Sequence, residues 1–155
     1  MTYASIAVEN KPPPSALGEI AMHHRKPKKP DAYPLRCLVV DDDGNILKLV
    51  SHMLTMIGFQ KVDTAQRKPE LMAKLANGSY DLLVTDLEMP DMNGFQLSNK
   101  IKNEAQDTKT IIMTGRHKNE CLEMMSARWV DGWLFKPFGL NELRHKLRGL
   151  GFPEQ

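Results

Sequence analysis

The sequence predicts an α/β fold, in which a doubly wound, five-stranded parallel sheet carries helices on both faces. Short β-rich runs alternate with segments of helical apolar spacing five times between residues 35 and 150, and such alternation is typical of parallel sheets. The composition agrees, because 41% hydrophobic and 26% charged residues are typical of a soluble globular domain. A chain of 155 residues has room for one such domain and a tail.

The first two strand–helix units take up residues 36–78. The apolar run Arg36–Val40 predicts the first strand, and apolar residues then recur at helical spacing over residues 46–57 until Gly58 ends the helix. A weaker strand is predicted at Gln60–Thr64. A short helix with apolar residues at 71–75 follows and closes at an Asn-Gly pair.

The remaining three units follow the same order with short spacers. The third helix begins after a loop that contains a proline and a glycine, and the last is an amphipathic helix with leucines at helical spacing. These elements are a strand at Asp81–Thr85, a helix at 95–101, a strand at Thr110–Met113, a helix around Asn119–Ala127, a strand at Gly132–Phe135 and a helix at 140–150.

Chemically useful side chains follow four of the five predicted strands. Asp41 and Asp42 follow the first strand, Asp86 the third, Thr114 the fourth and Lys136 the fifth. In parallel sheets of this kind, ligands bind beyond the carboxyl ends of the strands. We therefore expect three carboxylates, a hydroxyl and an ammonium group to meet at one edge of the sheet.

This set of groups predicts a site for phosphoryl transfer. Three converging carboxylates repel one another, and Mg²⁺, which prefers oxygen ligands, would relieve that repulsion. A lysine and a hydroxyl can bind phosphoryl oxygens, and a carboxylate can accept the phosphoryl group. The run Asp41-Asp42-Asp43-Gly44 fits two designs, since Asp41 could be a nucleophile or the adjacent acids could hold only the metal.

Residues 35–150 resemble the receiver domain of two-component response regulators, whose fold is flavodoxin-like, and most closely the single-domain, CheY-like kind. The matching segments, in the family's order and spacing, are LVVDDD (38–43), LLVTDLEMPDMNGF (82–95), IIMTGR (111–116) and WLFKPF (133–138). The resemblance implies that Asp86 is the phosphoacceptor. It also implies an Mg²⁺ site made by Asp41, Asp42, Asp86 and the carbonyl of Glu88, with Asp42 a direct ligand.

The resemblance also assigns roles to residues around the phosphoryl group. Thr114 and Lys136 would bind it, and the Lys136–Pro137 bond would be cis. Thr114 and Trp133, the aromatic residue on the fifth strand, would form the switch. Glu88 and Arg116 occupy positions that modulate hydrolysis, and their opposite charges predict an ion pair across the mouth of the site.

The same resemblance implies a signalling switch rather than an enzyme. The phosphodonor would be a sensor histidine kinase or a histidine phosphotransfer protein. A downstream protein would bind the face made by the fourth helix, the fifth strand and the fifth helix.

Two alternative functions remain at this stage. A haloacid-dehalogenase-type phosphatase would use Asp41 as its nucleophile and Asp43 as its acid/base. That family needs its Thr/Ser, Lys and further acids in a different chain order, so Asp43 is better interpreted as a helix cap. A pseudo-receiver would keep the fold as an interaction module without phosphorylation.

The tail and the domain differ in charge. Residues 1–34 carry five Lys/Arg and three acids, whereas residues 35–155 carry sixteen of each. A neutral domain predicts no direct DNA binding. The sequence ends just past the last helix, so we expect either a stand-alone receiver or a receiver excised from a longer protein. We expect the Pro-containing basic tail, residues 1–34, to be disordered, most simply as a solvated leader, although its run His23–Pro30 could contact a membrane, nucleic acid or an acidic partner.

The sequence also predicts a cytoplasmic protein without a membrane segment. No apolar run approaches the length of about 18 residues that a membrane helix needs. Cys37 and Cys121 lack metal-ligand spacing, so we expect buried thiols in a reducing compartment.

Overall fold

A five-stranded, fully parallel sheet forms the centre of the protein in the computed structural model, which describes residues 35–153. The predicted tail, residues 1–34, lies outside the described residues. The strand order is β2-β1-β3-β6-β7, and the five parallel strands are those that the alternating sequence pattern predicts. These strands are β1 (Arg36–Val40), β2 (Lys61–Ala65), β3 (Leu82–Asp86), β6 (Lys109–Thr114) and β7 (Gly132–Phe135).

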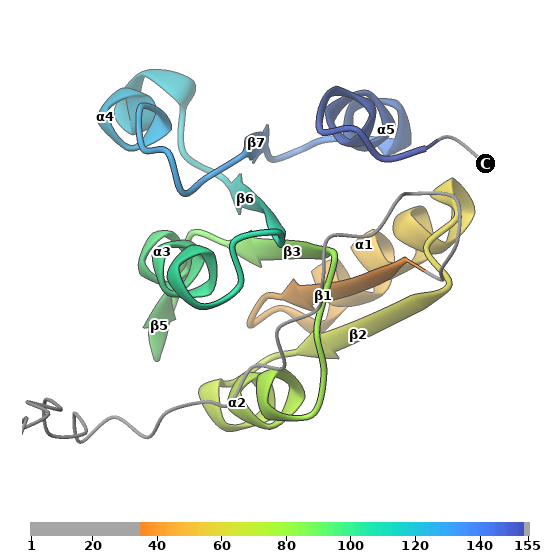
Figure 1. Cartoon of the computed structure of the whole chain (residues 1–155). Coiled ribbons are helices and arrows are strands. Elements are labelled where there is room, and N and C mark those ends of the chain that lie inside the picture. Colours follow the sequence, from red (N-terminus) through yellow and green to blue (C-terminus); the bar gives the residue numbers. More distant parts are fainter. Residues whose placement is uncertain (1–34, 154–155) are drawn as a thin grey trace, which may run out of the picture.

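Helices cover both faces of the sheet (Figure 1). One core cluster packs α1 and α5 against one face, through residues such as Leu54 and Leu143. On the other face, α2 and α3 contribute to a second cluster, and the segment from Cys121 to Trp133 forms a third. The helices are α1 (Gly44–Ile57), α2 (Lys68–Ala76), α3 (Gly94–Glu104), the 3₁₀ helix η1 (Lys118–Cys121), α4 (Leu122–Met125) and α5 (Leu140–Gly149).

Helix α1 has the ends that its sequence predicts. The Asp43 side chain accepts a hydrogen bond from the N–H of Asn45 at 2.8 Å, so Asp43 is the expected N-cap. At the other end Gly58 has a left-handed backbone (φ 119°), and its N–H donates to the carbonyl of Leu54. Because α1 is capped at Asp43 and β1 ends at Val40, Asp41 and Asp42 form the short link between them.

The predicted fourth helix is shorter and less regular than expected. The range 119–127 contains η1 and then a single α-helical turn, α4, and later bonds such as Ala127 N–H to Met124 C=O span only three residues. The chain beyond α4 is bound to the sheet instead. The Thr110 hydroxyl donates to the carbonyl of Trp129 at 2.7 Å, and the Trp129 ring packs on Phe95, 5.1 Å away between centroids.

A small hairpin follows β3 where the sequence predicted only a loop. It pairs β4 (Glu88–Met89) with β5 (Met92–Asn93) in antiparallel register around a two-residue turn. Strand ends also differ by one residue from the prediction, because Asp86 and Thr114 are the last residues of β3 and β6.

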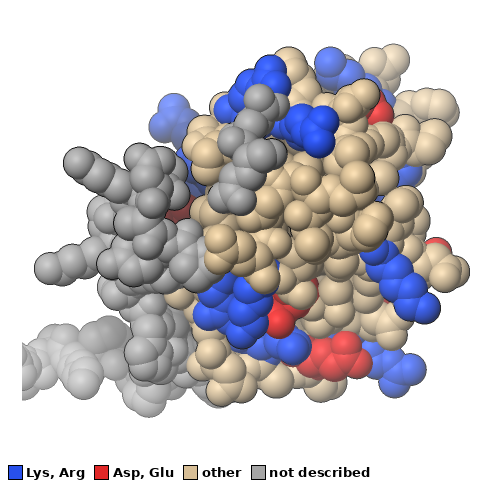
Figure 2. Space-filling view, turned by 90° about the vertical axis from the view of Figure 1, so that its right-hand side faces the viewer, with Lys and Arg blue, Asp and Glu red and all other residues tan. Residues whose placement is uncertain are grey.

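Lys and Arg side chains form separate groups on the face that Figure 2 shows, the right-hand side of Figure 1. A few acids lie among them, around a broad area of other residues, so the described residues visible there form no continuous basic surface of the kind that nucleic acid requires. Among residues 35–153, no helix has the length and apolar character needed to cross a bilayer.

Candidate functional site

The predicted site residues lie together at the carboxyl edge of the sheet. Asp41 and Asp42 follow β1, Asp86 ends β3, Thr114 ends β6 and Lys136 follows β7. The parallel register pairs Asp86 with Met113 and Thr114 with Phe135, which brings the ends of β3, β6 and β7 level with one another.

Lys136 joins the two buried acids. Its Nζ atom donates to Oδ2 of Asp41 at 3.0 Å and to Oδ1 of Asp86 at 2.9 Å. Its backbone N–H donates to the carbonyl of Thr114 at 2.7 Å, and the Lys136–Pro137 bond is cis, as predicted. Because Lys136 is linked to three strands in this way, its ammonium group has a defined position between the acids.

Burial and these contacts shift two pKa values. Burial raises the pKa of Asp86; the hydrogen bond and charge of Lys136 oppose this effect, and the nearby Asp41 and Asp42 reinforce it. Burial lowers the pKa of Lys136, but hydrogen bonds to Asp86 and Asp41 outweigh burial and raise that pKa overall. Lys136 is therefore a permanent cation at the site near neutral pH.

The acids fit a cation site that uses oxygen ligands. Asp41, Asp42 and Asp86 can each present one carboxylate oxygen so that the three atoms lie within 4.8 Å of one another. Asp41 is the least available to bind a metal, because both of its carboxylate oxygens already accept hydrogen bonds. Its Oδ1 accepts from the N–H of Asp43 at 2.9 Å, and its Oδ2 accepts from Lys136. Asp42 is exposed, and its side chain has no hydrogen bond among residues 35–153, so it fits the predicted role of direct ligand.

Thr114 and the Glu88–Arg116 pair lie around the same edge. The Thr114 hydroxyl is buried and accepts from the N–H of Arg116 at 3.0 Å, which leaves its own hydrogen free to donate. The Arg116 side chain donates to both carboxylate oxygens of Glu88, from Nε at 3.2 Å and from Nη2. The predicted ion pair is thereby confirmed, and its hydrogen bond raises the pKa of Arg116.

The backbone of Asp86 is closely packed against the start of α3. The Thr85 hydroxyl donates to the carbonyl of Asp86 at 3.0 Å, and the N–H of Gly94 donates to the carbonyl of Leu87 at 2.8 Å. A Cβ atom at Gly94 would lie only 2.0 Å from that Asp86 carbonyl oxygen. The glycine at this position therefore allows α3 to approach the backbone of the candidate phosphoacceptor.

Trp133 lies on β7, paired with Ile112 of β6, and is buried. Only 6% of it is exposed, and it packs with Ile112 and Cys121 in the third core cluster. Its ring lies nearly parallel to that of Phe135, 6.4 Å away. The indole N–H is buried without a hydrogen-bond partner among the described residues. Cys37 and Cys121 are the buried free thiols that the sequence predicts.

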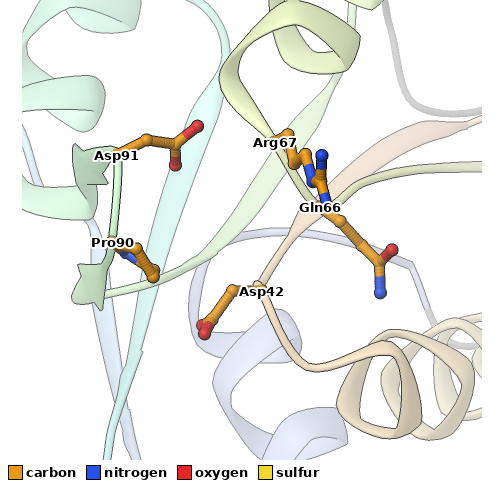
Figure 3. Close-up of a pocket in the computed structure, with 5 residues that line it drawn as sticks. All are labelled: Asp42, Gln66, Arg67, Pro90 and Asp91. Atoms are coloured by element: carbon orange, nitrogen blue, oxygen red, sulfur yellow. The ribbon is translucent and has the colours of Figure 1, made fainter.

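A pocket of about 410 Å³ opens beside the acid cluster and brings in residues that the sequence reasoning missed (Figure 3). Asp42 lies on one side of it and Asp91, from the β4–β5 turn, on a facing side. Gln66, Arg67 and Pro90 complete the lining. The signal in the sequence was a second acid, Asp91, after Glu88 in the segment that follows Asp86. Its position opposite Gln66 and Arg67 depends on the fold and could not be predicted from that signal.

Comparison with known proteins identifies the family. The sequence matches the family model described as response regulator receiver domain over residues 37–148. The chain belongs to this family. The receiver domain is thus a component of two-component signalling systems, and the comparisons give no support to the phosphatase alternative.

Known relatives match most of the chain. The receiver domain is 30% identical over 149 residues to the transcriptional regulatory protein TrcR of Mycobacterium tuberculosis, a match that covers 96% of this chain and 56% of TrcR. It is 29% identical over 115 residues to the chemotaxis protein CheY-3 of Vibrio cholerae, which covers 73% of this chain and 88% of CheY-3. The chain is also 34% identical to the heme response regulator HssR of Staphylococcus haemolyticus over 116 residues, which is 75% of this chain. It spans about half the length of these two regulators, 56% of TrcR and 51% of HssR.

Solved structures have the same fold. The chemotaxis response regulator CheY4 of Vibrio cholerae matches with a TM-score of 0.67 and 29% identity, over 76% of this chain and 99% of that one. The response regulator TrrA of Thermotoga maritima, solved in complex with Mg²⁺-BeF, matches with a TM-score of 0.65 and 33% identity, over 75% of this chain and 98% of that one. The receiver domain therefore has the predicted flavodoxin-like, CheY-like fold.

Proposed function

We propose that this receiver domain accepts a phosphoryl group on Asp86 from a phosphohistidine of a sensor histidine kinase or a histidine phosphotransfer protein. The observation that carries the proposal is the hydrogen bond from Lys136 to Oδ1 of Asp86, since it orients the carboxylate and leaves Oδ2 without a partner among residues 35–153. Oδ2 attacks phosphorus, the O–P bond forms as the P–N bond breaks, and the leaving imidazole nitrogen keeps the electron pair and takes up a proton.

Lys136 and Thr114 would bind the transferred phosphoryl oxygens. Lys136 supplies a positive charge next to Asp86, and the Thr114 hydroxyl has its hydrogen free to donate. Thr114 ends β6, which pairs with β3, and Lys136 directly follows β7, which pairs with β6. Both groups therefore need little reorganisation to meet the charge that develops on the phosphoryl group.

Asp42 and Asp86 would hold Mg²⁺ as direct carboxylate ligands, together with the carbonyl of Glu88. Asp41 contributes its charge to the same cluster and positions Lys136. When bound, Mg²⁺ would neutralise charge on these carboxylates and on the phosphoryl oxygens. TrrA, a relative of similar fold, was solved in complex with Mg²⁺-BeF, which supports this assignment.

Phosphorylation would switch a protein-binding surface. It adds a charge of about −1.5 to −2 beside Thr114 and Lys136, and Thr114 and Trp133 would transmit the change to the face made by α4, β7 and α5. A downstream protein would bind this face. We place the protein in the cytoplasm as a signalling switch rather than an enzyme, without direct contacts to DNA or membrane.

Glu88 and Arg116 would set the lifetime of the phosphorylated state. Their ion pair joins β4 to the loop after β6, and both side chains are exposed, 57% for Glu88 and 42% for Arg116. An exposed pair contributes little to stability. Its effect should therefore be on the access of hydrolytic water to the phosphoryl group.

Phosphorylation by acetyl phosphate and Mg²⁺, followed by intact mass and peptide mapping, tests the proposal. One phosphoryl group should appear on Asp86, and Asp86→Asn should abolish it while Asp43→Asn retains it. A phosphate on Asp41 of the unchanged protein would contradict the assignment. No mass gain from acetyl phosphate or from any phosphohistidine donor would instead indicate a pseudo-receiver.

A further inference from the structure

The pocket beside the acid cluster is larger than a metal ligand set requires. Three separate segments line it, the loops after β1 and β2 and the turn of the β4–β5 hairpin (Figure 3). Its volume of about 410 Å³ is room for roughly a dozen water molecules at about 30 Å³ each. Asp42, the acid best placed for direct metal ligation, lines this pocket, so a cation at Asp42 would face a space large enough for water ligands.

Asp91 faces the same space and has a fixed orientation. Its Oδ2 atom accepts a hydrogen bond from the backbone N–H of Lys68, at the start of α2, at 2.9 Å. Its Oδ1 atom has no hydrogen bond among the described residues. Asp91 also lies in the two-residue turn that the Met89–Met92 pairing closes, on the same hairpin as Glu88. The hairpin and α2 therefore hold Asp91 in a defined place relative to the predicted metal ligands.

A magnesium site at Asp42 needs acceptors beyond its direct ligands. Mg²⁺ is octahedral and usually keeps several waters, and Asp42, Asp86 and the Glu88 carbonyl would fill only three of about six positions. Groups that hydrogen-bond to metal-bound ligands change metal affinity by about 10–100-fold. Of the side chains that line the pocket, only Asp42 and Asp91 are acids, and Asp91 has an oxygen to spare.

We propose that Asp91 is a positioning residue for the metal, whose free Oδ1 atom accepts a hydrogen bond from a water ligand of the Mg²⁺ held by Asp42 and Asp86. This inference rests on the proposed function, because it takes the acid cluster to be an Mg²⁺ site. It adds to that function a residue from the β4–β5 turn, outside the four strand ends that the sequence indicated.

The simpler role for Asp91 is to cap α2. Arg67, the residue at the N-cap position of α2, makes no side-chain cap, and the Lys68 N–H is bound by Asp91 instead. The variant Asp91→Asn keeps the capping role and removes the proposed metal-positioning role. The asparagine oxygen can still accept from the Lys68 N–H, but the group then facing the pocket is an NH₂ donor, which cannot accept a hydrogen bond from metal-bound water.

The test is the affinity for Mg²⁺ alone, measured by calorimetry without any phosphodonor. A salt concentration of about 0.15 M limits long-range charge effects to about 8 Å. Asp107→Asn is the matched control, because it removes the same charge from an exposed position in the loop between α3 and β6. Thermal unfolding without metal reports the cap, and Asp91→Ala, which removes the cap as well, gives the scale for its loss.

Asp91→Asn should weaken Mg²⁺ binding by about tenfold, while its metal-free unfolding temperature stays closer to the parent than that of Asp91→Ala. Asp107→Asn should bind Mg²⁺ like the parent. Equal affinities in Asp91→Asn and Asp107→Asn would overturn the role of Asp91 and leave the proposed function standing. A parent protein that binds no Mg²⁺ would remove both this inference and the metal site of the proposed function.

Discussion

Replacing Gly94 by alanine should displace the backbone of Asp86, the candidate phosphoacceptor. A Cβ atom at this position would lie 2.0 Å from the carbonyl oxygen of Asp86 and 2.9 Å from its carbonyl carbon. Contacts of a real Cβ essentially never fall below 3.0 Å, so the Asp86 peptide or the first turn of α3 must move by about 1 Å. The Thr85 hydroxyl, which donates to the same carbonyl, lies 3.1 Å from the added atom and cannot make way without losing its bond.

Two opposing effects set the change in the free energy of unfolding. Overpacking of a closely packed region costs about 1–3 kcal/mol, and alanine recovers at most about 1 kcal/mol of helix propensity at the start of α3. We expect the free energy of unfolding to fall by about 1–2 kcal/mol. Because a displacement of about 1 Å in a reacting group can cost about 100-fold in rate, phosphorylation by acetyl phosphate should slow far more than stability alone suggests.

Urea unfolding and the rate of acetyl phosphate-dependent mass gain measure these two effects. Gly149→Ala, near the end of α5, is the control, because it is exposed and its added Cβ meets no atom within 4 Å. If Gly94→Ala unfolds within about 0.5 kcal/mol of this control and is phosphorylated at the parent's rate, the close approach of α3 to Asp86 does not constrain the site.

Four further expectations follow from the site and its surroundings. Asp43→Ala should lower the free energy of unfolding by about 1 kcal/mol through loss of the α1 cap, yet keep phosphorylation at Asp86; loss of phosphorylation in a folded variant would give Asp43 a chemical role. Autodephosphorylation of Glu88→Gln, Arg116→Gln and the double variant at saturating Mg²⁺ should show coupling, so single effects that simply multiply would rule out a gate made by the pair. Burial raises the pKa of Asp86, so the folded state holds this proton more tightly than the unfolded chain, and stability is lost as pH rises from the usual aspartate range through the raised pKa. Asp86→Asn should therefore melt above the parent at pH 7 and approach it near pH 4; an equal difference at both values would contradict this cause. Hydrogen exchange should change more in α4 than in α1 on phosphorylation, and an unchanged α4 would exclude it from the readout.

The sheet and the site edge could be predicted from sequence because they depend on local patterns. Four of the five strands, β1, β3, β6 and β7, are largely apolar runs, and a reactive residue ends or follows each of them. The rule that ligands bind beyond the carboxyl ends of parallel strands then places Asp86 beside Lys136 without further information. The cap at Asp43 is equally local, because it involves a residue only two positions away.

The features that the sequence did not predict depend on contacts between distant segments. The fourth helix ends at Met125, and a few residues later the carbonyl of Trp129 accepts a hydrogen bond from Thr110, nineteen residues away. The spacing of apolar residues cannot predict such a bond. The role of Asp91 at α2 joins residues separated by twenty-three positions. Arg116 and Glu88 were predicted as a pair only because family resemblance placed both at the phosphoryl group.

The least firmly packed part of the candidate output face is α4, and this gives a physical reason for it to respond. None of the four residues of α4 is fully buried: Leu122 is 56% exposed, and only Met124 and Met125 pack, partly buried, against the third core cluster. Segments with few buried contacts have the lowest free energies of local opening.

The backbone bond from Lys136 to Thr114 connects the phosphoryl site to β6 and β7, and Trp133 on β7 packs against Cys121, the residue before α4. The indole N–H of Trp133 is buried without a partner among residues 35–153, which costs free energy in this arrangement. A phosphoryl group that changes the partners of Lys136 and Thr114 therefore acts on a packed element with an unsatisfied donor, next to the turn that is easiest to move.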